Sequence, residues 1–279
     1  MKKTIIVLTL AVLGFNASAQ DSLVVNKRGI PVLPKAGDIG IGLDGTPFFN
    51  YVGNMFNSNT SNGLNLGDNT LYFRYFLKDD AAVRLRLRIA STSNITNYNV
   101  LDDAAIAQNP LSNKEVEERT TIKNNYYELN VGYQQFRGYN RLRGFYGADL
   151  GFGYYKGNTK NEYGNKMNVL NPAPSTAIPG ATAGDRIVEQ VSSTPSKAIS
   201  LGVFAGAEYY FMPKICVGLE LGLSYGKSWD GQEYTKREHM VGSINETYET
   251  VDKAGGDSYR SLTTEFPYSY GNLYFMIHF

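Results

Sequence analysis

Apolar and polar residues alternate with a period of two along much of this chain, most strictly over residues 81–90. The apolar residues of this segment share one side: Val83, Leu85, Leu87 and Ile89. The arginines share the other side: Arg84, Arg86 and Arg88. Because successive side chains of a β-strand point to opposite faces, this pattern predicts a strand with one apolar and one basic face.

Seven further segments show the same alternation. They are residues 38–44, 70–78, 125–136, 145–155, 198–211, 215–226 and 268–279. Together with residues 81–90 they make eight predicted strands, an even number that suits a closed antiparallel barrel. We therefore predict an all-β fold, an eight-stranded antiparallel up-and-down barrel.

The connections between the predicted strands alternate between short and long. Short turns are expected around residues 78–80, 137–144 and 212–214, and long connections at residues 45–69, 91–120, 157–197 and 230–262. Outer-membrane barrels have short periplasmic turns and long external loops, whereas a soluble barrel has no reason to gather its long loops at one end. The alternation predicts a transmembrane barrel whose apolar faces meet lipid and whose polar faces line the lumen.

Tyrosines on the outward faces form two groups. One group lies near the short-turn end: Tyr75, Tyr133, Tyr146 and Tyr209. The other lies near the long-loop end: Tyr127, Tyr154 and Tyr225. Two rings of aromatic residues are typical of the two membrane–water interfaces. The alternative, that tyrosine simply favours strands, explains the number of tyrosines but not their clustering at strand ends.

The composition of the chain argues against several other classes of protein. Hydrophobic residues make up 42% of the chain, the mean hydropathy is −0.30, and no run reaches the length that a membrane helix needs. A barrel with one apolar face per strand is compatible with such an average. The net charge of +1 gives no attraction to nucleic acid, and the single cysteine, Cys216, excludes an internal disulfide framework.

The first residues read as a secretory signal peptide. Lys2 and Lys3 precede an apolar stretch over residues 4–15, and Ala17-Ser18-Ala19 forms a small-residue cleavage site. Mature protein would begin at Gln20. The expected organisation is therefore a signal peptide over residues 1–19, a periplasmic lead-in over 20–37 and an outer-membrane barrel over 38–279.

The last residues, 270–279, end on an aromatic side chain with apolar residues at alternate positions: Leu273, Phe275, Ile277 and Phe279. This ending resembles the C-terminal insertion signal of outer-membrane barrels. With the strand count, the chain resembles the eight-stranded OmpX/OmpA-barrel class, without the periplasmic C-terminal domain of OmpA. The resemblance implies the outer membrane of a Gram-negative bacterium, with both termini periplasmic. It also implies contact with outer-membrane lipid and lipopolysaccharide, and with the barrel-assembly machinery during biogenesis.

Charged residues on the inward faces are predicted to form a network in the lumen. The members are Arg74, Arg84, Arg86, Arg88, Glu128, Asp149, Glu208 and Glu220. An eight-stranded barrel is filled by side chains, and buried charges must be paired. We expect Glu128 to be the nearest partner of the arginines in 81–90, with Glu208 and Glu220 reaching from across the barrel. The alternatives are a gate for a narrow ion path and a binding site.

Two long connections have a distinctive composition. Residues 46–56 are apolar and are expected to form a helical turn that closes over the barrel mouth; the alternative is a surface patch that meets a partner. Residues 168–184 are rich in proline, glycine and small residues, and suggest a mobile loop without regular structure.

Catalytic residues are not predicted. His239 has Ser243 and Glu246 nearby in sequence, but on no predicted rigid element, and His278 would lie at the periplasmic end of the last strand. No cofactor or metal site is expected. The favoured function is a structural or surface-interaction barrel whose external loops contact a surface protein or a glycan. The alternatives are a narrow channel or carrier for small solutes, with inward glycines leaving space, and a lipid-modifying enzyme.

Overall fold

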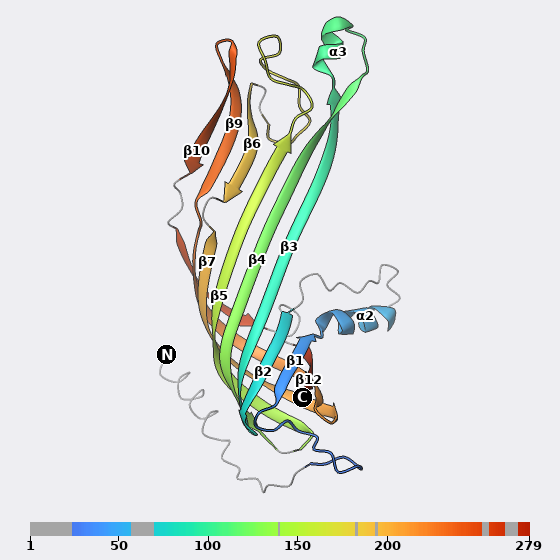
Figure 1. The fold of residues 1–279 in the computed structure, drawn as a ribbon, viewed down its shortest axis with the longest axis vertical. Helices are drawn as coiled ribbons and strands as arrows, with labels where there is room; N and C mark the ends of the chain where they lie inside the picture. The colour runs from blue at the N-terminus through green and yellow to red at the C-terminus, as the bar shows by residue number, and fades with distance from the viewer. Residues whose placement is uncertain are drawn as a thin grey trace.

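The computed structural model of the protein describes residues 24–56, 70–138, 140–181, 184–192, 195–252, 257–265 and 273–279. The predicted signal peptide lies outside these residues. Strands dominate the described part of the chain, and Figure 1 shows them rising from a barrel at one end of an elongated molecule.

Eight strands form a closed antiparallel barrel, so this part of the prediction is confirmed. They are β1 (Ile39–Asp44), β2 (Thr70–Lys78), β3 (Ala81–Leu101), β4 (Glu115–Arg137), β5 (Leu142–Glu162), β7 (Ser196–Met212), β8 (Ile215–Trp229) and β12 (Leu273–His278). Each strand pairs with the next one in this order. The pairing of β12 with β1, for example Ile277 with Ile41, closes the ring.

The two faces of the wall follow the period of two. In β1, Ile39, Ile41 and Leu43 are exposed on the outside, whereas Asp44 is buried on the inside. The same alternation holds in β2 and β3, where Arg74 and Arg84 lie opposite each other and both are buried. The barrel therefore presents apolar side chains outward and buries charged ones.

Three strands are much longer than predicted. Beyond residue 90, β3 continues to Leu101 in unbroken register with β4. β4 already begins at Glu115, and β5 continues to Glu162. The expectation of a loop over 91–120 was wrong for this reason, and only residues 102–114, which include the short helix α3 (Asp103–Gln108), connect the two strands. Residues 91–101 of β3 are exposed on nearly every side, so the alternation that reveals a strand is absent there.

In the described part of the chain, four more strands lie outside the closed ring. β6 (Asp185–Ser192) pairs with the outer part of β5, β9 (Glu233–Val241) pairs with β6, and β10 (Ile244–Asp252) pairs with β9. β11 (Ser258–Glu265) pairs with the outer half of β8, while β12 pairs with the inner half. The predicted long connections 157–197 and 230–262 therefore contain strands. Residues 268–272 of the predicted last strand lie outside the described residues.

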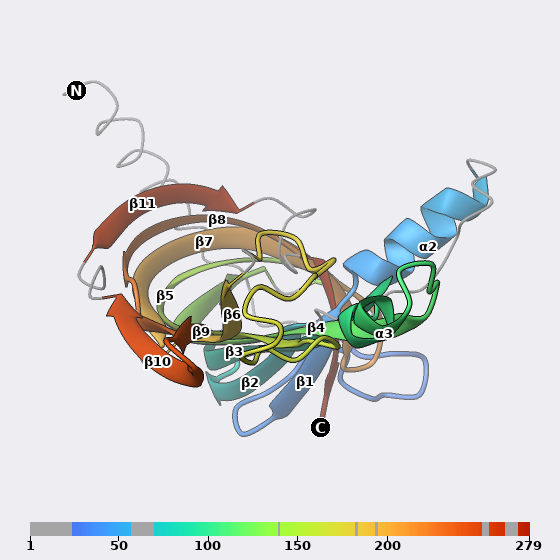
Figure 2. The same ribbon diagram turned by 90° about the horizontal axis from the view of Figure 1, so that it is seen from above.

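The segment 46–56 is helical, as α2 (Thr46–Phe56), but it does not close the barrel mouth. Figure 2 looks along the long axis and shows α2 pointing away from the barrel. Its first aromatic residue, Phe48, packs edge-on against Phe275 on the outside of β12, with ring centroids 6.0 Å apart, and this contact sets the outward direction. Neither helix in the described part of the chain is long and apolar enough to cross a membrane.

The described part of the loop predicted to be mobile, residues 168–181, has little regular structure, but polar contacts fix it to the outer ends of the long strands. The Asp103 carboxylate accepts hydrogen bonds from the Asn171 side chain at 2.6 Å and from the Ser175 backbone at 2.8 Å. Although partial burial opposes the shift, these hydrogen bonds hold the pKa of Asp103 below its usual value. The fully buried Glu118 accepts from the Ala177 backbone at 2.8 Å.

The apolar core fills the short-turn end of the barrel. It comprises Val32, Tyr72, Phe76, Ala82, Phe136, Phe145, Phe204, Tyr210, Cys216, Tyr274 and Met276. Val32 comes from the segment before β1, where its carbonyl accepts a hydrogen bond from the Lys214 backbone at 2.8 Å. The lead-in segment thus packs against this end of the barrel and contributes to its core.

Candidate functional site

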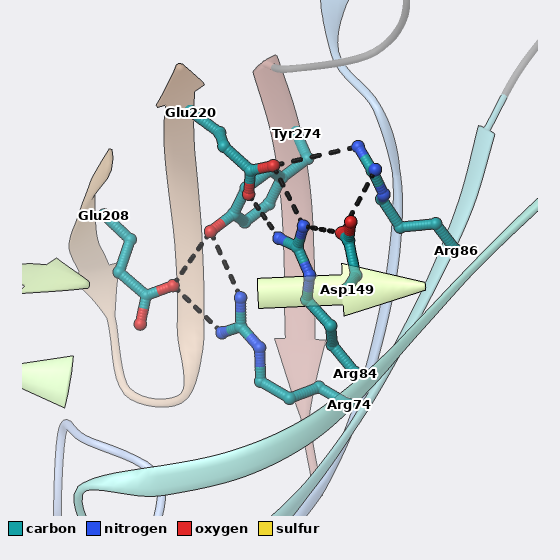
Figure 3. Close-up of polar contacts among 7 residues, drawn as sticks. All are labelled: Arg74, Arg84, Arg86, Asp149, Glu208, Glu220 and Tyr274. Atoms are coloured by element: carbon teal, nitrogen blue, oxygen red, sulfur yellow. Dashed lines mark hydrogen bonds and ion pairs between the residues drawn. The ribbon is translucent and has the colours of Figure 1, made fainter. Parts of the chain in front are cut away.

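Six of the eight predicted inward charges gather into two groups, both drawn in Figure 3. The first group is centred on Arg74 of β2, whose guanidinium lies 2.9 Å from the Glu208 carboxylate of β7. The Tyr274 hydroxyl lies 3.1 Å from both of these side chains, and the Tyr210 hydroxyl donates to Glu208 at 2.6 Å. The Tyr274 hydroxyl therefore contacts both charged groups, and the Tyr210 hydroxyl contacts the Glu208 carboxylate.

The second group joins two arginines of β3 to two acids from the other side of the barrel. Arg84 forms ion pairs with both Asp149 of β5 and Glu220 of β8. Arg86 lies 3.2 Å from Asp149 and 3.7 Å from Glu220. Two positive and two negative charges therefore alternate in space within one cluster.

Burial makes this pairing necessary. Every side chain in these ion pairs is at most 9% exposed. Removing one partner of a buried ion pair typically costs about 3–5 kcal/mol, because the other charge is left without compensation. Both groups are electrically balanced, so the arrangement can be stable inside the barrel.

Glu128 does not occupy the expected position beside Arg86. Its carboxylate accepts hydrogen bonds from the Tyr126 hydroxyl at 2.7 Å and from the Asn130 side chain at 2.8 Å, while Arg86 reaches Asp149 and Glu220. Arg88 pairs in register with Glu128, and its guanidinium lies over the Tyr126 ring at 5.8 Å. The arginines reach across the barrel because Gly202 and Gly222 leave room beside the second group.

Arg143 is a buried charge that the sequence reasoning missed. It is inward-facing at the start of β5, its guanidinium lies 4.3 Å from the centre of the Phe136 ring, and it donates to the Asp79 carbonyl at 2.9 Å. The signal was present in the sequence, because Arg143 has the same parity as Phe145 and Asp149. It was overlooked because the predicted strand began at 145 rather than 142.

Two of the inward glycines lie directly against aromatic rings. A Cβ atom at Gly218 would collide with the Tyr274 ring, and one at Gly206 would collide with the Phe145 ring. The aromatic side chains therefore occupy the space that these glycines provide. A cavity beside the second charge group, lined by Arg84, Asp149 and Gly202 among others, has a volume of about 10 Å³, roughly what one water molecule requires.

The outside of the barrel carries the predicted aromatic and C-terminal residues. All seven girdle tyrosines are exposed there. Tyr127 and Tyr154, whose rings are 5.8 Å apart, lie within β4 and β5 rather than at strand ends, since both strands continue outward. Leu273, Phe275, Ile277 and Phe279 all lie on the outward face of the last strand.

His239 lies on β9, outside the closed ring. Its ring stands edge-on to Tyr248 with centroids 4.6 Å apart, beside an open surface hollow of about 370 Å³ that Asp185 also lines. In register, His239 lies opposite Glu246, and Ser243 lies in the turn between β9 and β10. His278 is buried at the short-turn end, with Nδ1 3.0 Å from the Lys214 carbonyl. Within the described ranges, no three His, Cys, Asp or Glu side chains gather as a metal ion requires.

Comparison with known proteins adds no relative: no family model matches this chain, and no curated protein matches it.

Proposed function

We propose that this protein is an outer-membrane β-barrel with a structural or surface-interaction role, whose extended outer wall meets molecules at the cell surface. The termini would be periplasmic, and lipid and lipopolysaccharide would surround the barrel. The ion pairs in the lumen would close the interior of the barrel to solutes.

The inverted distribution of side chains carries this proposal. Arg74, Glu208 and Glu220 are buried inside the ring, whereas Ile41, Leu150 and Leu201 are about half exposed on its outside. Soluble proteins bury apolar surface and leave charges in water, because each Å² of apolar surface removed from water contributes roughly 25 cal/mol. A closed barrel with the opposite arrangement suits a lipid surrounding.

A surface role is favoured over transport by where the barrel is filled and where it extends. Aromatic rings and ion pairs occupy the inside, whereas β3, β4 and β5 continue well beyond the ring and carry β6, β9 and β10 beside them (Figure 1). The β3 extension is mostly polar and exposed. Such a wall offers a large surface for a protein or glycan partner.

Two arginine substitutions test the membrane placement. Leu150→Arg changes an outward residue of the ring that is 50% exposed, and Ile95→Arg changes an outward residue of the β3 extension that is 61% exposed. In lipid, arginine near the bilayer midplane costs roughly 2–4 kcal/mol, whereas in water either change is nearly neutral. We expect Leu150→Arg alone to reduce the amount of heat-modifiable barrel in the outer-membrane fraction.

Equal, small effects of the two substitutions, or recovery of the wild-type chain as soluble periplasmic protein, would refute the membrane placement. A planar-bilayer recording tests the role separately. Steady ionic conductance by the wild-type protein would favour a channel over a surface-interaction barrel.

A further inference from the structure

The helix α2 is apolar along one side and charge-free throughout. From Phe48, its apolar residues follow at the spacings of one helix face: Phe48, Tyr51, Val52, Met55 and Phe56. Asn50 and Asn54 lie on the opposite face. This spacing is that of an amphipathic helix, whose apolar stripe has to be covered.

In the part of the chain that the structure describes, the second half of that stripe is exposed. Exposure rises along the helix as it leaves the barrel: Val52 is 48% exposed, Met55 63% and Phe56 84%. In Figures 1 and 2, α2 runs sideways from the outer end of β1, across the long axis of the molecule rather than along it. Apolar side chains as exposed as Val52, Met55 and Phe56 on one side of a helix mark a contact surface.

The start of the helix is continuous with the outward apolar face of the barrel. Leu43 is the last outward residue of β1, and the helix begins three residues later at Thr46. Gly45 donates its backbone N–H to the Leu273 carbonyl at 2.6 Å, and Phe48 packs against Phe275, which lies next to Leu43 in the register. The apolar side of the helix is thus joined to the surface proposed above to face lipid.

We infer that α2 is an interfacial helix, which lies in the outer leaflet of the same membrane with its apolar side among the acyl chains. This inference rests on the proposed membrane placement. The absence of charge in residues 46–56 favours the boundary between head groups and acyl chains over an electrostatic contact with anionic groups. With about 16 Å of length, the helix would extend the lipid-contacting surface well beyond the barrel wall.

Site-specific fluorescence in vesicles tests this inference. Three single-cysteine variants in a Cys216→Ser background would each carry an environment-sensitive label: Val52→Cys on the apolar side of α2, Asn50→Cys on its polar side, and Leu150→Cys on the barrel wall. The protein is reconstituted into phospholipid vesicles, and quenching by brominated lipid is compared with quenching by aqueous iodide. We expect brominated lipid to quench the labels at positions 52 and 150 to a comparable degree, and iodide to quench the label at position 50.

Each contrary outcome has its own meaning. If lipid quenches the label at position 150 while the label at position 52 behaves like that at position 50, the interfacial helix is refuted and the membrane barrel stands. If lipid does not quench the label at position 150, the membrane placement itself fails. If the label at position 52 is shielded from both quenchers only at high protein density in the vesicle, the helix binds a second copy of the chain instead of lipid.

Discussion

Separating Arg74 from Glu208 should destabilise the barrel strongly, and removing both should cost less than the sum of the two single changes. The two side chains are 3% and 0% exposed, and 2.9 Å separates their charged atoms. Arg74→Met leaves the Glu208 carboxylate with the hydroxyls of Tyr210 and Tyr274 and the Cys216 thiol, none of which is charged. Glu208→Gln leaves the guanidinium without a counter-charge.

The magnitude follows from the cost of an uncompensated charge. Each single substitution should lower the free energy of unfolding by about 3–5 kcal/mol, with Arg74→Met towards the lower value because two hydroxyls still solvate the carboxylate. In the double variant neither charge is present, so we expect a coupling energy of about 2–3 kcal/mol in a double-mutant cycle. The measurement is urea unfolding of the reconstituted barrel, followed by circular dichroism and by mobility on unboiled gels.

A control cycle pairs Arg74→Met with Glu128→Gln. Glu128 is hydrogen-bonded to Tyr126 and Asn130, so these two changes should be additive within about 0.5 kcal/mol. Additivity in the Arg74–Glu208 cycle as well, with small single effects, would mean that both charges are hydrated. That result would refute the buried ion pair and favour an open, water-filled lumen.

Three further predictions concern other parts of the molecule. Gly218→Ala should lower the stability of the barrel in the same urea assay, because the new methyl group collides with the Tyr274 ring. The ionised Asp103 carboxylate stabilises the loop that contains Asn171, and its pKa lies below the usual 3.8. This stabilisation of the loop is present above about pH 4 and is lost as the pH falls through the lowered pKa. Asp103→Asn should therefore remove the acid-induced loosening of the loop, which hydrogen exchange measures. Phe279→Ala should slow membrane insertion without lowering stability, because the side chain is 65% exposed and the backbone that pairs with β1 is retained.

Each of these predictions has a contrary result. Full stability of Gly218→Ala, with the Gly53→Ala change on exposed α2 as control, would show that the lumen has more space than the structure allows. Unchanged acid sensitivity of Asp103→Asn would assign the loosening to another acid. Normal insertion kinetics of Phe279→Ala would argue against a terminal assembly signal.

Alternation in the sequence was sufficient to predict the closed ring. The range 70–78 predicted for β2 matches the structure, because an alternating segment there meets a short turn at Asp79-Asp80. Alternation also gave the inward direction of Arg84 and Glu220, since parity along a strand fixes the face. The period of two carries information only where the two faces have different surroundings.

This condition explains why the extension of β3 could not be predicted from the sequence. Residues 91–101 have solvent on both faces, so no apolar pattern marks the strand, and pairing with β4 supplies the missing information. The partners of Arg86 could not be predicted from the sequence either. Parity places a guanidinium inside the barrel, but its reach across to Asp149 depends on small residues such as Gly202 on distant strands. The outward course of α2 likewise depends on a contact with Phe275, from the other end of the chain.

The ion pairs and the apolar core inside the barrel bear on which part of the molecule can carry its function. A solute path through the ring would have to break the Arg84 ion pairs and also displace the aromatic layer around Phe145 and Tyr274. It would further have to move Val32, which belongs to the segment before β1 and packs into the same core. The ion pairs and the apolar core therefore both oppose such a path, whereas neither restricts the wall formed by β3, β4 and β5. The proposed surface role therefore predicts that functional substitutions will lie on these extensions and leave barrel stability unchanged.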